Sequence, residues 1–145
     1  MFNALSSKVA FDNLEDSLSG TLSVYPVAAD AVVVTSDGSA WDRTGAFAEV
    51  VPVLTITHDI WLEALVIETT SNVDTFLLDV ATGLALAEVV IASVRTTITH
   101  VANTNSVSIP IRKKIAANTR ISVRSTCKTA AALTASVSIS YRAVA

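Results

Sequence analysis

Few side chains of this 145-residue chain combine the types and the spacing that chemistry needs. His58 and Asp59 are adjacent and would suit a general acid–base pair. They fall in a strand-like stretch, where neighbouring side chains point to opposite faces, so they cannot act together on one substrate. Asp12, Glu15 and Asp16 gather near the N-terminus without the loop spacing and the glycine of a calcium loop. Neither group predicts a catalytic or metal site.

Cofactor chemistry has no better support. Cys127 is the single cysteine, which excludes an intrachain disulfide and a cysteine-rich metal site. The chain has only 4 glycines, and it contains no glycine-rich phosphate loop, nucleophile elbow or metal-ligand motif. We therefore expect a protein that is not an enzyme and carries no cofactor or metal.

One loop is a candidate for ligand binding. Trp41, Asp42 and Arg43 follow the tight-turn pair Asp37–Gly38. They place an aromatic ring, an acid and a base on three successive positions, a set that would suit a carbohydrate or a receptor. We treat these three residues as a possible ligand loop.

These residues must be positioned by strands. The composition is 51% hydrophobic and 16% charged, and it leans on Ala, Val, Ile, Ser and Thr, which favours strands over helices. Short alternating segments separated by turn residues predict one all-β domain over residues 21–145, an antiparallel jelly-roll (Greek-key) sandwich. Two short segments, 21–25 and 31–36, come first. The eight expected core strands are 49–58, 60–70, 74–80, 88–94, 97–101, 106–112, 119–125 and 135–141.

Residues 1–20 differ from the rest. Their apolar side chains follow an imperfect helical spacing that Asn, Ser and Gly20 interrupt. The pattern predicts a short helix or, preferably, an arm that orders against a neighbouring molecule. The segment lacks the basic and apolar regions of a secretory signal, and no stretch of the chain is apolar enough to span a membrane. The candidate arm contacts are Phe2, Leu5, Val9, Phe11 and Leu14.

Charge is divided sharply along the chain. Residues 1–88 hold all 13 Asp and Glu but only two of the 10 Lys and Arg, and no acid follows Glu88. Such asymmetry often marks a nucleic-acid-binding tail. Here the late bases sit singly between Ile and Val on alternating strands, Tyr141 is the only aromatic residue among them, and the net charge is −3. We therefore expect no nucleic-acid partner.

The alternative is that the two halves neutralise each other. In a jelly roll, early and late strands interleave because the chain folds back as a long hairpin. With the eight strands numbered in order, Glu63 and Glu68 should pair with strand 119–125, which should also lie beside Glu88, and strand 74–80 should lie beside 106–112. The same polarity would also suit contacts between subunits. The interaction candidates on charged strands and the adjoining turn are Glu63, Glu68, Arg112, Lys113, Lys114, Arg120 and Arg124.

One set of motifs carries a resemblance. TFLLDVATG, EVVIASV and SIPIRKKIAANTRISVRS, followed by a Ser-rich strand, resemble small jelly-roll virion proteins of tailed phages, over roughly residues 60–126. The sequence departs from that pattern where Ala116–Ala117–Asn118 replaces Pro-Ala-Gly and where Lys113–Lys114 adds charge. Because Asn tolerates the left-handed conformation, we expect the hairpin formed by these two strands to survive.

The resemblance implies a virion component, either a capsid decoration protein or part of a head or tail fibre. Our first expectation is a decoration (cement) protein, made in the host cytoplasm and located on the capsid surface. It would bind across major capsid subunits as a homo-oligomer, a trimer or a dimer, with no membrane partner. The alternative is a receptor- or carbohydrate-binding module of a phage fibre that uses the possible ligand loop.

Overall fold

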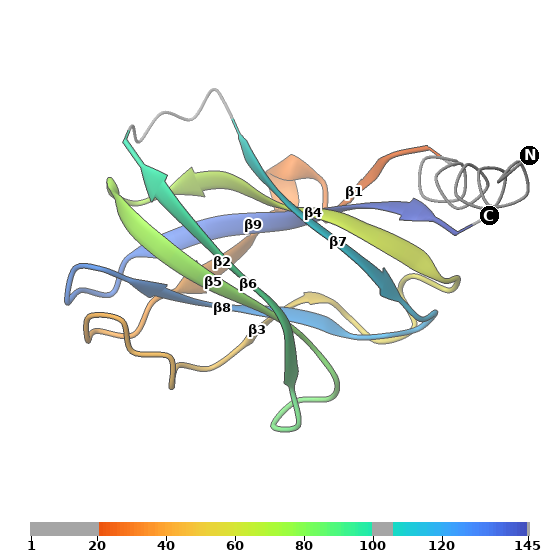
Figure 1. Cartoon of the computed structure of the whole chain (residues 1–145), viewed down its shortest axis with the longest axis horizontal. Helices are drawn as coiled ribbons and strands as arrows, with labels where there is room; N and C mark the ends of the chain where they lie inside the picture. Colours follow the sequence, from red (N-terminus) through yellow and green to blue (C-terminus); the bar gives the residue numbers. More distant parts are fainter. Residues whose placement is uncertain (1–20, 100–105, 145) are drawn as a thin grey trace, which may run out of the picture.

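Alternating buried and exposed side chains build two antiparallel sheets that pack face to face (Figure 1). The structure is a computed structural model, and it describes residues 21–99 and 106–144. A short 3-10 helix, η1 (Ala28–Asp30), separates the first two strands. The strands are β1 (Ser23–Tyr25), β2 (Val32–Thr35), β3 (Ala48–Val51), β4 (Ile60–Thr70), β5 (Asp74–Thr82), β6 (Val89–Ile98), β7 (Val107–Ile115), β8 (Ile121–Cys127) and β9 (Thr134–Ala143).

The strands form four nested antiparallel pairs. β5 pairs with β6, β4 with β7, β3 with β8, and β2 with β9, and successive pairs alternate between the sheets. One sheet, the β9 sheet, has the order β1-β9-β4-β7, with β2 also on β9. The other, the β8 sheet, has the order β3-β8-β5-β6. A long hairpin folded back in this way is a jelly roll, which confirms the expected fold class.

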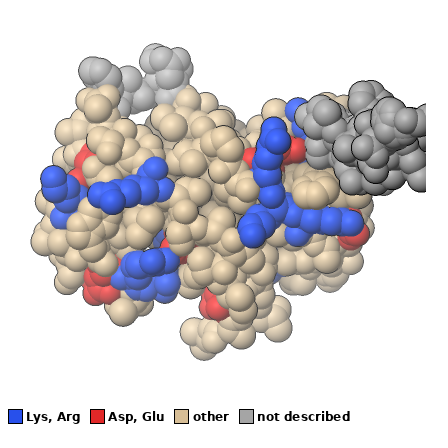
Figure 2. Space-filling view, in the orientation of Figure 1, with Lys and Arg blue, Asp and Glu red and all other residues tan. Residues whose placement is uncertain are grey.

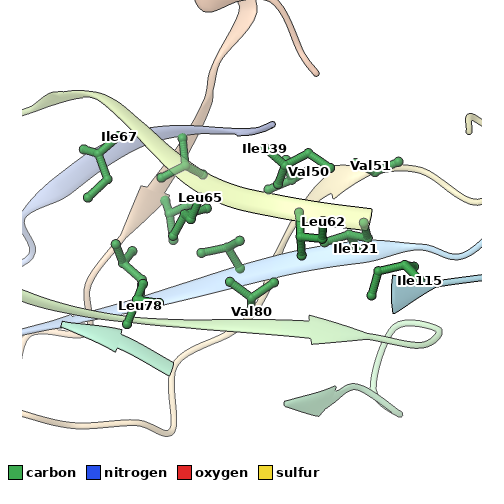
Figure 3. Close-up of a cluster of buried hydrophobic side chains, with 14 of the residues drawn as sticks. Val50, Val51, Leu62, Leu65, Ile67, Leu78, Val80, Ile115, Ile121 and Ile139 are labelled. Carbon is green, nitrogen blue, oxygen red and sulfur yellow. The ribbon is translucent and has the colours of Figure 1, made fainter. Parts of the chain in front are cut away.

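The core lies between the sheets. Figure 3 shows Leu62 and Leu65 of β4 pointing toward Leu78 and Val80 of β5, and all four are fully buried. Burial of each such side chain contributes about 1.5–3 kcal/mol. The opposite face of each strand is thereby turned outward, which places the charged side chains on the outer faces of the sheets.

The expected strand count was wrong at two points. β1 and β2 were left out of the core strands, yet both pair with β9 and close the outermost hairpin. Residues 97–101 were counted separately, whereas β6 runs unbroken to Ile98. The first counted strand is also shorter than expected, because β3 ends at Val51 and the chain turns from Pro52, whose carbonyl accepts the Thr55 N–H at 3.3 Å.

These errors shifted the predicted strand pairs. In a nested hairpin a strand's partner depends on its position counted from the end, so one strand miscounted changes all pairs. β4 pairs with β7 and β9 instead of residues 119–125, and β5 pairs with β6 and β8 instead of 106–112.

Candidate functional site

Glu63 on β4 lies between two bases of neighbouring strands. Its Oε2 is 3.9 Å from Arg112 Nε, and its Oε1 is 3.7 Å from Arg142 Nε. Arg112 sits at an irregularity in the pairing of β4 with β7, has a φ of 58° and remains largely exposed. The predicted pairing of Glu63 with Arg120 is therefore wrong, because β7 and β9, not β8, flank β4.

Lys113 and Lys114 continue along β7, an edge strand of the β9 sheet. Both side chains are exposed, and Figure 2 shows basic side chains gathering where β7 runs in Figure 1. Within the part of the chain that the structure describes, no ion pair involves Lys113, Lys114 or Glu68. Charged residues and Pro110 on this strand also protect its edge against pairing with other chains.

Arg120 closes one end of the β8 sheet. Its Nε donates to Glu49 Oε2 at 2.7 Å, and its Nη1 donates to Glu88 Oε1 at 3.0 Å and to the Gly83 carbonyl at 3.1 Å. The side chain is 9% exposed. Arg120 contacts Glu88 as predicted, although β5 lies between β8 and β6 in the sheet. The contact with Glu49 was missed because no partner was predicted for strand 49–58, which as β3 pairs with β8.

Asp79 forms a second network in the middle of the same sheet. It is 1% exposed and accepts hydrogen bonds from Arg43 Nη2 at 2.6 Å, Arg43 Nε at 3.1 Å, Arg124 Nε at 2.9 Å and Ser93 Oγ at 2.6 Å. Burial raises the pKa of Asp79, but the hydrogen bonds from Ser93, Arg43 and Arg124 outweigh it and hold the pKa below its ordinary value. Arg124 therefore pairs with Asp79, not with the predicted acids of β4.

The possible ligand loop is bound to the sheet by its own side chains. Arg43 is engaged with Asp79, and Asp42 Oδ1 accepts the Thr44 N–H at 2.8 Å and its hydroxyl at 2.6 Å. The Arg95 guanidinium lies 4.9 Å from the centre of the Trp41 ring. Two of the three predicted ligand residues thus stabilise the loop, and the Trp41 ring is covered in part by Arg95.

An apolar end of the β8 sheet was not anticipated. Val51 and Thr82 both pair with Ile121, so the loops after β3 and β5 flank the start of β8 at the same end. These loops and the start of β6 expose large hydrophobic side chains, which we call the leucine end: Val53, Leu54, Leu84, Leu86 and Val89. The apolar run from residue 84 was visible in the sequence, but its exposure was not.

Other predicted features are distributed as follows. The arm residues Phe2, Leu5, Val9, Phe11 and Leu14 lie outside the described residues. In ranges 21–99 and 106–144, no three His, Cys, Asp or Glu side chains come together as a metal site. No helix in those ranges is long and apolar enough to cross a membrane.

Comparisons with protein families, curated proteins and solved structures find only weak similarity. No protein-family model and no curated protein matches the chain. Among solved structures, one of infectious bursal disease virus, Gt strain, superposes with a TM-score of 0.39 and 11% sequence identity. The match covers 89% of this chain and 39% of that one, so this chain spans well under half of that chain's length.

Proposed function

We propose that the protein is a structural component of a virion, and more narrowly a decoration (cement) protein that binds across major capsid subunits of a tailed-phage head. The supporting observation concerns the motifs that resemble phage virion proteins. Their polar residues contact one another although they are distant in sequence: Arg120 binds Glu88 and the Gly83 carbonyl, and Arg124 binds Asp79. The motifs thus act as one structural unit of a jelly roll, as expected of a non-catalytic virion protein.

The charge distribution is consistent with such a role. Arg43, Arg120 and Arg124 are engaged in ion pairs within the fold, so these three guanidiniums already have partners. The exposed Lys113 and Lys114 remain available on the edge of β7 and would suit an acidic patch on a capsid subunit. A decoration protein repeats its contacts across a lattice, so modest single contacts suffice for stable attachment.

Copy number in purified virus particles tests the proposal directly. Quantitative mass spectrometry of intact particles should find hundreds of copies, which should remain with heads when heads and tails are separated. Heads that lack the protein should lose resistance to heat or to low salt. A handful of copies that separate with tails would instead indicate a fibre module, and absence from particles would refute a virion role.

Adding the protein back to heads that lack it tests the basic edge. The double charge reversal Lys113→Glu, Lys114→Glu should reduce co-sedimentation with heads at low salt by roughly tenfold. Lys128→Glu is the control for charge reversal elsewhere on the surface, because Lys128 is also exposed but follows β8 on the other sheet. Equal binding by both variants would exclude β7 as the capsid contact.

A further inference from the structure

Two turns at the leucine end hold leucine in a backbone conformation that suits glycine or asparagine. Leu54 has a φ of 66° in the turn closed by the Thr55 N–H and the Pro52 carbonyl. Leu86 has a φ of 68° in the turn closed at 3.0 Å by the Ala87 N–H and the Leu84 carbonyl. A side chain with a Cβ is strained in this region.

Leu54 and Leu86 also expose their apolar side chains to water, which is unfavourable in addition to the backbone strain. Leu54 is 66% exposed and Leu86 is 100% exposed, so neither side chain gains much from burial within the monomer. Asn118 shows the contrast, since it has a φ of 63° and is of a residue type that tolerates this conformation. A leucine that is both strained and exposed indicates a contact outside the monomer.

The tip of the β5–β6 hairpin is also held in place. Gly83 has a φ of 110°, and a Cβ added there would lie 2.8 Å from the Ala87 carbonyl oxygen. The Arg120 guanidinium binds the Gly83 carbonyl from the sheet below. In Figure 1 this loop projects at the bottom of the molecule, and the same lobe is mostly uncharged in Figure 2. The exposed Leu86 is thus presented in a defined position.

A hollow lies directly beside Leu86. It has a volume of about 390 Å³ and is lined mainly by small and apolar residues. Its acid, Glu88, is paired at 3.0 Å with Arg120, which also binds Glu49 just outside the hollow, so both charged side chains of the lining already have partners within the fold. The lining residues are Thr44, Gly45, Ala46, Phe47, Ala85, Leu86, Glu88 and Arg120.

We propose that the leucine end is a self-association surface, in which Leu86 of one copy inserts into this hollow of a second copy around a two-fold axis. One patch carries both the projecting side chain and the adjoining hollow, so it is complementary to itself, as a two-fold contact requires. This inference is independent of the virion role.

The test is Leu86→Asn in the full-length chain. Asparagine keeps the left-handed turn and removes the apolar side chain, so analytical ultracentrifugation should show the dimer dissociation constant raised at least about tenfold. The Tm should be unchanged or higher when both proteins are measured below the wild-type dissociation constant, where both are monomeric. Leu86→Gly should behave in the same way.

Val73→Asn is the matched control. Val73 is 54% exposed in the turn before β5, at the opposite end of that strand, and its replacement should leave the dissociation constant unchanged. The proposal is overturned if the wild-type chain stays monomeric at millimolar concentration, or if Leu86→Asn and Leu86→Gly dimerise as tightly as wild type. A lower Tm for both variants would overturn the argument that Leu86 is strained.

Discussion

Arg43 binds the buried carboxylate of Asp79 through two nitrogens, Nη2 to Oδ1 at 2.6 Å and Nε to Oδ2 at 3.1 Å. Arg43 belongs to the loop between β2 and β3, whereas Asp79 lies in the middle of β5. The pair therefore fastens a long connection to the outer face of the β8 sheet. Arg124 binds the same carboxylate from β8, so two guanidiniums depend on one acid.

Asp79→Asn should therefore be strongly destabilising. The amide keeps the shape but removes the charge, which leaves two partly buried guanidiniums facing each other without a counter-ion. We expect the free energy of unfolding, measured by urea denaturation at pH 7, to fall by about 3 kcal/mol. Glu63→Gln is the control, because its ion pairs at 3.7 and 3.9 Å are long and one partner is well exposed. Its cost should stay below about 1 kcal/mol, and equal losses would contradict this ranking.

Asp79 should also make stability depend on acidity. Its pKa in the folded chain lies below the ordinary value of 3.8, because hydrogen bonds from Ser93, Arg43 and Arg124 outweigh the opposing effect of burial. The unfolded chain thus binds the proton more readily, so the stabilisation is complete above about pH 5 and is lost as the pH falls through 3.8 and then through the lowered pKa. Wild type should lose stability more steeply than Asp79→Asn between about pH 5 and pH 2. Parallel curves from thermal unfolding would show that another carboxyl is responsible.

The sequence predicted the kind of ion pairing but not the partners. Within the described residues, every ion pair except Arg43–Asp79 joins an acid at or before Glu88 to a base after it, as the charge division indicated. The charge division does not predict the Arg43–Asp79 pair, because both residues lie in the acidic half of the chain. Apart from Arg120–Glu88, the specific partners were wrong because the outermost strands, β1 and β2, were not counted.

The leucine end was missed for a different reason. Sequence rules locate left-handed turn positions by Gly and Asn, and Leu54 and Leu86 carry no such signal. Asn118, by contrast, has the φ of 63° that was expected where the related pattern has Gly. The turn it occupies joins β7 to β8, which lie in different sheets, so the expected hairpin was wrong and the turn is a link between sheets.

Substitution of Asn118 tests that turn. Its N–H donates to the Ile56 carbonyl at 2.8 Å, so the turn also holds the β3–β4 connection. Asn118→Ala should lower the free energy of unfolding by about 1 kcal/mol, because alanine is strained at positive φ. Asn118→Gly should stay within about 0.5 kcal/mol of wild type, because glycine adopts this φ freely. Both variants remove the asparagine side chain and differ from each other by one methyl group. Equal free energies of unfolding in urea would therefore argue against backbone strain.

The four nested strand pairs have a consequence for how the chain folds. β5 and β6 are joined by a short loop and can meet first, whereas β2 and β9 lie at opposite ends of the sandwich sequence and meet across the whole of it. Each inner pair, once formed, brings the next two strands together, so we expect closure to proceed outward from the β5–β6 hairpin. The tip that carries Leu86 therefore belongs to the hairpin whose contacts are closest in sequence. Substitutions in this hairpin should change the folding rate more than substitutions in β9 do.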